Sequence, residues 1–156
     1  MPILLIHGPN LSQLGHRDPA VYGNATLAEV VDTVRAVLPD VADYDSEREG
    51  DLVQRLHAAR TDGTTAVIVN PGALSHYSYA LRDALEQLDV PKVEVHLSQV
   101  HARERFRHHS VVSAVCHVTI TGAGLFGYRL AAEAAVHLLE ERSQASQAFQ
   151  AVKPPD

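Results

Sequence analysis

TAVIVN, residues 65–70, is a short apolar run that predicts a β-strand, and it leads into NPG, residues 70–72, a typical loop sequence. The segments on either side, GDLVQRLHAAR at 50–60 and SHYSYALRDALEQL at 75–88, carry apolar residues at helical spacing. A strand between two helices is the repeating unit of proteins whose parallel strands are joined by helices. This stretch therefore favours an α/β fold.

The same alternation continues outward from residues 65–70 in both directions. Further strands are predicted at 3–6, 41–45, 92–97 and 111–120, and further helices at 26–38 and 124–142. The segment 111–120, VVSAVCHVTI, is nearly all apolar, as a strand covered on both faces would be. Five strands that alternate with helices favour a flavodoxin-like α/β fold, which is a doubly wound five-stranded parallel sheet.

We expect a single catalytic domain over residues 1–143. The chain has 156 residues, enough to bury a core, and it shows no internal repeat or linker. Residues 144–156 have no periodicity, and we expect this tail to be poorly ordered. The helix at 26–38 is expected to begin at a cap formed by Thr26, with Glu29 three residues further on.

The composition argues against several classes of function. The net charge is −6 and the basic residues do not form runs, so nucleic acid is not an expected partner. No apolar segment approaches the ~20 residues of a membrane span, and the N-terminus lacks the basic flank of a signal peptide. The single cysteine, Cys116, excludes a disulfide framework and favours a cytoplasmic location.

Ligands of doubly wound sheets bind beyond the carboxyl ends of the strands, so the strand exits are the segments to search. No G-x-G-x-x-G follows the first strand, which disfavours nucleotide binding, and no H-E-x-x-H motif supports a zinc site. Cys116 is expected in mid-strand as inert packing. Lys92 and Lys153 are the only lysines, and neither is placed to form a Schiff base at a strand exit. We expect neither a metal nor a cofactor.

General acid–base chemistry remains, and the loop GHRDPAVYG, residues 15–23, holds Arg17 and Tyr22 five positions apart. A tyrosine is a weak base at neutral pH because its ordinary pKa is about 10, and holding it ionised costs about 4 kcal/mol. A cation within about 4–6 Å offsets about one to three units of that difference. Arginine suits this task because it keeps its own proton. The loop would then act as a lid over the site.

Four motifs in this chain closely resemble the type II 3-dehydroquinate dehydratases. They are GPNLSQLGHRDPAVYG at 8–23, NPGALSHYSYALRDAL at 70–85, VEVHLSQVHARERFRHHS at 93–110 and TGAGLFGYRLA at 121–131. The resemblance implies a cofactor-free, reversible anti-dehydration of 3-dehydroquinate to 3-dehydroshikimate through an enolate. The same reaction serves shikimate biosynthesis and quinate breakdown, and the residues favour neither.

The resemblance also implies a role for each residue of the catalytic group. Tyr22 becomes the proton acceptor, as a tyrosinate, and Arg17 becomes its activator. His96 becomes the proton donor, with Glu94 orienting it. Asn10 would position the water or dipole that stabilises the enolate oxygen.

Substrate binding is implied for a second group of residues, namely Asn70, His76, Leu97, Ser98, Arg103, Arg107 and Asp83. Arg103 corresponds to a second arginine of the family that helps to place the lid. Asp83 would reach the substrate site of a neighbouring subunit. That contact agrees with the assembly that the resemblance implies, a homododecamer built as a tetramer of trimers.

The chain departs from the usual family pattern at a few positions near the expected site. His7 stands where asparagine is common, and Ser12, Gln13, Glu47, Arg48 and Gln99 also differ. These changes affect the base of the lid and a subunit contact more than the acid–base set. Two alternatives stay open: a non-catalytic binding protein that kept the pocket, and a flavodoxin-like electron carrier, which the absent phosphate loop disfavours.

Overall fold

A parallel β-sheet of five strands forms the centre of the molecule in the computed structural model, which describes residues 2–152. The strands are β1 (Ile3–His7), β2 (Ala42–Asp45), β3 (Ala66–Asn70), β4 (Lys92–His96) and β5 (Val118–Thr121). They lie in the order β2-β1-β3-β4-β5, and every neighbouring pair is parallel. The predicted doubly wound flavodoxin-like fold is confirmed.

The burial of each strand follows its place in the sheet. Every residue of β1, β3 and β4 is buried, whereas the edge strands β2 and β5 mix partly buried and exposed positions. Central strands are covered by helices on both faces, so they need apolar side chains at successive positions. In β1, Ile3 and Leu5 pack into one core cluster, while Leu4 and Ile6 pack into the other.

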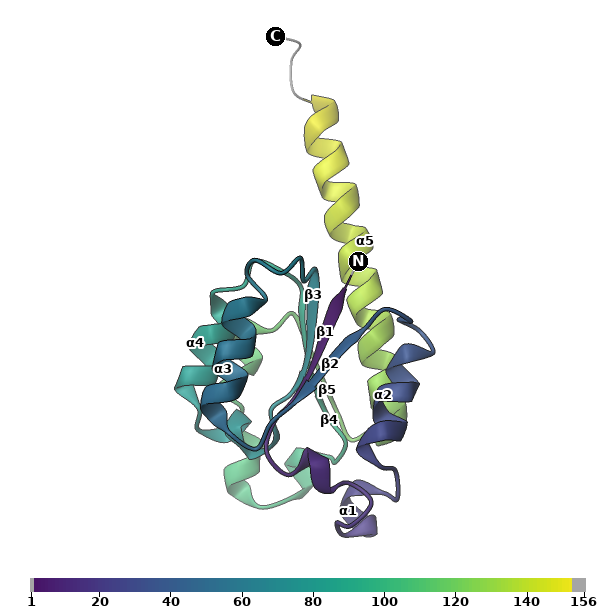
Figure 1. Cartoon of the computed structure of the whole chain (residues 1–156), viewed down its shortest axis with the longest axis vertical. Coiled ribbons are helices and arrows are strands. Elements are labelled where there is room, and N and C mark those ends of the chain that lie inside the picture. Colours follow the sequence, from purple (N-terminus) through teal and green to yellow (C-terminus); the bar gives the residue numbers. More distant parts are fainter. Residues whose placement is uncertain (1, 153–156) are drawn as a thin grey trace.

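Two helices cover each face of the sheet (Figure 1). Helices α2 (Leu27–Arg35) and α5 (Leu125–Val152) pack on one face, and α3 (Glu49–Ala58) and α4 (Tyr79–Glu86) on the other. The predicted cap of α2 is present as a capping box, in which Thr26 and Glu29 each bond to the other's backbone. Because all five strands are parallel, their exits lie together at one end of the molecule.

The segments that follow the strands at this end are short and mostly 3-10 helical. They are η1 (Leu11–Gln13), η2 (Gly72–His76), η3 (Val100–Ala102), η4 (Arg105–His108) and η5 (Ser113–Val115). A short helix α1 (Pro19–Tyr22) lies within the loop that the sequence analysis describes as a lid. It begins at Asp18, whose side chain accepts a hydrogen bond from the Ala20 amide.

The structure corrects two predicted elements. The strand predicted at 111–120 begins only at Val118, and the helix predicted at 75–88 begins only at Tyr79. Val111 and Val112 are buried in a core cluster from a loop, so their apolar character reflects core packing and not a strand. Cys116 therefore lies in that loop and not in mid-strand, and burial raises the pKa of its thiol to about 12.

Helix α5 runs well beyond the body of the molecule (Figure 1). It continues to Val152, and its residues from 140 onward are exposed. The predicted boundary at residue 143 thus falls inside a continuous helix. The division of the chain into a domain over 1–143 and a tail over 144–156 stays a prediction, and residues 153–156 of that tail lie outside the described residues. No helix within residues 2–152 is both long and apolar enough to cross a membrane.

Candidate active site

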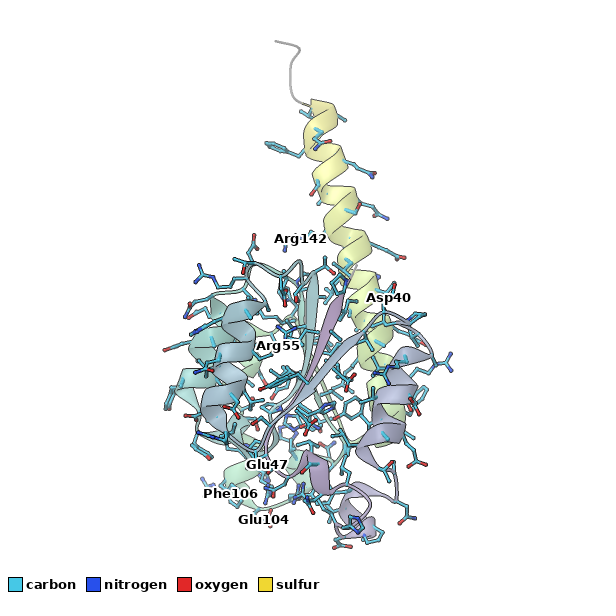
Figure 2. All side chains as sticks on the ribbon, in the orientation of Figure 1. Asp40, Glu47, Arg55, Glu104, Phe106 and Arg142 are labelled. Atoms are coloured by element: carbon cyan, nitrogen blue, oxygen red, sulfur yellow. The ribbon has the colours of Figure 1, made fainter. Side chains whose placement is uncertain are left out.

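A pocket of about 120 Å³ lies beyond the carboxyl ends of β1, β3 and β4. This is the edge at which doubly wound sheets bind their ligands. Its wall contains most of the predicted site residues: Asn10, Arg17, Tyr22, Asn70, His76, His96, Leu97, Ser98, Arg103 and Arg107. Pro9, Leu11, Gly72, Ala73 and Val100 complete the lining and were not predicted. In Figure 2, Glu104 and Phe106 mark the same end of the molecule.

Tyr22 is held by two arginines from different parts of the chain. Its phenolic oxygen accepts hydrogen bonds from Arg17 Nη2 at 2.6 Å and from Arg103 Nη2 at 2.8 Å. The guanidinium of Arg17 also lies 3.7 Å from the ring centroid. Hydrogen bonds from charged donors are shorter and stronger than those from neutral ones. The expected pairing of Arg17 with Tyr22 is present, and Arg103 joins it across the pocket.

Arg103 connects the lid to the rim of β4. Its Nη1 donates to Ser98 Oγ at 3.1 Å while its Nη2 donates to Tyr22. Ser98 is nearly buried, and its carbonyl accepts a hydrogen bond from the Gly122 amide. The carbonyl of Leu97 likewise accepts one from the Gly124 amide. The backbone after β4 is therefore fixed on one side by the β5–α5 loop and meets the lid on the other.

The base of the lid is tied to the loop between β2 and α3. The Glu47 carboxylate accepts hydrogen bonds from the Asn10 backbone N–H at 2.8 Å and from Ser12 Oγ at 2.5 Å. These bonds, together with the charge of Arg17, hold the pKa of Glu47 below its usual range. Asn10 has a left-handed backbone with φ of 70°, a conformation that asparagine tolerates better than most residues. Figure 2 places Glu47 at the same end of the sheet as the pocket.

Glu94 and His96 form a buried pair at the end of β4. The two side chains share one face of the strand, and His96 Nε2 lies 2.8 Å from Glu94 Oε1. The Glu94 carboxylate also accepts from the hydroxyls of Ser110, Ser113 and Thr119. Burial alone would raise the pKa of Glu94, but the bonds from His96 and the serines outweigh it and lower that pKa. An ionised Glu94 fixes the orientation of the His96 ring.

The opposite wall presents Asn70, His76 and Arg107. Asn70 closes β3, and its side chain bonds to the Gly72 amide and the Tyr128 hydroxyl. His76 Nδ1 lies 2.8 Å from the His109 carbonyl, so this nitrogen must carry the hydrogen. Burial is the main cause that lowers the pKa of His76, which favours a neutral ring. Arg107 Nε donates to Glu104 at 2.6 Å.

Two predicted residues do not line this pocket. Glu94 lies behind His96, as an orienting group would. Asp83 is exposed on α4 and outside the pocket lining, so any contact it makes with substrate would belong to another subunit's pocket. Three groups that the sequence analysis did not single out support the site from behind, namely Ser110, Ser113 and Tyr128.

The lining of the pocket carries positively charged side chains. Arg17, Arg103 and Arg107 line it, whereas no carboxylate among the described residues 2–152 belongs to its lining. Guanidinium groups bind carboxylates by paired, charge-assisted hydrogen bonds. Within residues 2–152, no three His, Cys, Asp or Glu side chains are grouped to hold one metal ion. The arrangement suits a small anionic substrate that exchanges protons with Tyr22 and His96.

Comparison with known proteins gives a consistent match. The family model described as dehydroquinase class II matches residues 1–136. A catabolic 3-dehydroquinase of Botryotinia fuckeliana is 48% identical over 149 residues, which cover 92% of this chain and 97% of the relative. A 3-dehydroquinate dehydratase of Thioalkalivibrio sulfidiphilus is 47% identical over 142 residues, covering 88% and 97%. A crystal structure of type II dehydroquinase from Butyrivibrio crossotus matches with a TM-score of 0.83 at 41% identity, covering 90% and 97%.

Proposed function

This chain belongs to the dehydroquinase class II family, and we propose that its pocket dehydrates 3-dehydroquinate through an enolate, with a tyrosinate base and a histidine acid. The reaction of the family converts 3-dehydroquinate to 3-dehydroshikimate and water, and the chain is a type II 3-dehydroquinate dehydratase. The observation that carries the proposed mechanism is the Tyr22 oxygen between two guanidinium groups.

In the first step, the Tyr22 phenolate takes the proton from the carbon next to the substrate ketone. The electron pair of the broken C–H bond moves into the carbonyl and gives an enolate. Arg17 and Arg103 stabilise the phenolate before the transfer through their positive charge and hydrogen bonds. A guanidinium also keeps its own protons, so it does not act as a competing acid or base. Asn10 positions the water or dipole that stabilises the enolate oxygen.

In the second step, His96 gives a proton to the departing hydroxyl group. The enolate re-forms the ketone, the electron pair of its C=C bond makes the new double bond of the product, the C–O bond breaks, and the oxygen leaves as water. The contact between Nε2 and Glu94 supports this role because it leaves Nδ1 as the ring nitrogen for proton transfer. Tyr22 and His96 then return to their starting protonation states by exchange with solvent.

We assign substrate binding to Asn70, His76, Leu97, Ser98, Arg103 and Arg107. Arg107 matches the carboxylate of the substrate, since Arg17 and Arg103 are bonded to the Tyr22 oxygen. We further propose a cytoplasmic enzyme assembled as a homododecamer of four trimers, in which Asp83 reaches a neighbouring pocket. The exposed position of Asp83 on α4 supports this placement.

The test is direct. Purified protein is mixed with 3-dehydroquinate, and the ultraviolet absorbance of the conjugated enone product is followed. We expect a rise with the wild type, and no measurable rise with Tyr22→Phe, which should still bind the ligand. An absent rise at high concentration of the wild type would contradict the dehydratase function. Substantial turnover by Tyr22→Phe would contradict the assignment of the base alone.

The assembly is tested separately by size-exclusion chromatography with light scattering. We expect a particle about twelve times the 16.9 kDa mass of one chain. Asp83→Ala should lower activity if this side chain serves a neighbouring pocket. A stable monomer with full activity would contradict both the dodecamer and the role of Asp83.

A further inference from the structure

A buried hydrogen bond joins the pocket to the long helix α5. The side-chain amide of Asn70, at the end of β3, donates from Nδ2 to the Tyr128 hydroxyl oxygen at 2.7 Å. Tyr128 lies in the first turns of α5 and is fully buried, and Asn70 is only 3% exposed. The contact spans 58 positions of the sequence, so it exists only in the folded sheet.

The orientation of the Asn70 amide is decided by a second contact. The Gly72 backbone amide lies 3.1 Å from Asn70 Oδ1. A backbone N–H can only donate, so the atom that faces it must be the oxygen. Only glycine fits at position 72, because its φ is 59° and a Cβ there would lie 2.8 Å from the Pro9 carbonyl oxygen. The nitrogen of Asn70 therefore points to Tyr128.

The Tyr128 hydroxyl is a fixed acceptor because its ring is held in the core. The ring belongs to the core cluster between the sheet and α5, which also contains Ala131 and Ala132. The His7 ring lies against it at a centroid distance of 5.6 Å. Burial raises the pKa of Tyr128, so the hydroxyl stays neutral. A neutral, immobilised hydroxyl can hold an amide without placing a charge beneath the substrate.

We propose that Tyr128 is a positioning residue for substrate binding, acting through the hydrogen bond that its hydroxyl oxygen accepts from Asn70 Nδ2. With Gly72 on the oxygen and Tyr128 on the nitrogen, the amide keeps one N–H and one oxygen lone pair for the substrate. Tyr128 does not line the pocket and touches no reacting atom. The inference rests on the proposed function, because it takes Asn70 as a substrate-binding residue.

The test replaces Tyr128 by phenylalanine, which keeps the ring that fills the core and removes only the hydroxyl. We expect KM for 3-dehydroquinate to rise about tenfold, the factor that one net hydrogen bond provides. The value of kcat should stay within about twofold, since Asn70 binds substrate and transition state alike. Tyr44→Phe is the matched control, because Tyr44 is a partly buried tyrosine that packs elsewhere in the core and lies outside the pocket lining. Its KM should equal that of the wild type.

A double-mutant cycle separates positioning from a general structural effect. On the background of Asn70→Ala, the change Tyr128→Phe should leave KM unchanged within about twofold. Equal losses on both backgrounds, or an unchanged KM in the single variant, would overturn the inference while the wild type stays active. A wild type that neither converts nor binds 3-dehydroquinate would overturn the proposed function as well. Calorimetric binding of 3-dehydroquinate to every variant distinguishes these outcomes.

Discussion

At the scale of single residues, the chemistry of the pocket depends on the two guanidinium groups that donate to the phenolic oxygen of Tyr22. Arg17 reaches Tyr22 from within the lid, and Arg103 reaches it from the loop after β4. Arg103 spans two acceptors at once, Tyr22 and Ser98. A planar guanidinium can hold such a fork, whereas the ammonium of lysine is a compact point charge. Shape, in addition to charge, therefore matters at this position.

Arg103→Lys should lower kcat by about tenfold to a hundredfold, because lysine keeps the charge but not both contacts. Steady-state kinetics by product absorbance measures the effect. Arg129→Lys is the matched control, since Arg129 forms an exposed i,i+4 ion pair with Glu133 on α5. A kcat of Arg103→Lys equal to that of the control would show that charge alone is sufficient there.

His7 gives the molecule a specific sensitivity to acid. Its side chain is 1% exposed, and its Nε2 is buried with no hydrogen-bond partner among the described residues. Burial lowers the pKa of His7 from 6.5 to about 4. The unfolded chain thus binds this proton at a higher pH than the folded protein does. Stability from this group is complete above pH 6.5 and falls as the pH drops toward 4, by about 3 kcal/mol.

His7→Asn should remove that part of the acid dependence. Urea unfolding between pH 7 and pH 4 gives the free energy of unfolding at each pH. We expect the decrease for His7→Asn to be smaller than for the wild type by up to about 3 kcal/mol. His57→Asn, at an exposed position on α3, is the control and should keep the wild-type dependence. Parallel curves for His7→Asn and the wild type would refute the prediction.

At the scale of elements, the lid depends on a loop from elsewhere in the sheet. The loop between β2 and α3 supplies Glu47, which binds the backbone and side chain at the start of the lid. Ser12 and Glu47 are both departures from the usual family pattern, and the structure pairs them. The two changes therefore form one local arrangement at the entrance to the lid.

Glu47→Ala should lower kcat/KM about threefold to tenfold, because the Asn10 backbone N–H and the Ser12 hydroxyl lose their acceptor. Cleavage within residues 11–23 by limited proteolysis should become faster, since the loop would open more often. Glu49→Gln, an exposed carboxylate two positions further on, is the control. If Glu47→Ala matched that control in both measurements, the contact would have no role in lid placement.

At the scale of the whole molecule, the end of α5 contributes little to the packed body. Residues 140–152 are exposed, and Figure 1 shows the helix projecting from the sheet. This projecting end of α5 gains no burial energy within one chain. Truncation after Ser143 should therefore leave the melting temperature within about 2 °C and kcat/KM within about twofold of the full chain. A truncated chain that lost activity and formed smaller particles than the full chain would show that this segment is needed for the proposed assembly.

Local patterns in the sequence determined the fold class and the place of the site. The apolar runs at 3–6 and 65–70 predict strands, because a strand that is buried on both faces needs apolar side chains at successive positions. The strand exits then indicate the pocket, since a parallel sheet brings its carboxyl ends to one edge. Arg17 and Tyr22 were predictable as a pair because they lie five positions apart in one loop. Residues 111–117 misled because burial of a loop and of a strand select the same residue types.

Contacts between distant segments were decided only by the tertiary structure. Arg103 meets Tyr22 across 81 positions, Ser110 and Ser113 reach Glu94, and Tyr128 meets Asn70. Neither the spacing nor the periodicity of the sequence predicts these pairs, because they depend on the strand order and on how closely the helices approach the sheet. The sequence by itself determined which residue types stand at each strand exit. The packing of the sheet decided which of them meet, since hydrogen bonds require positions correct to within an ångström.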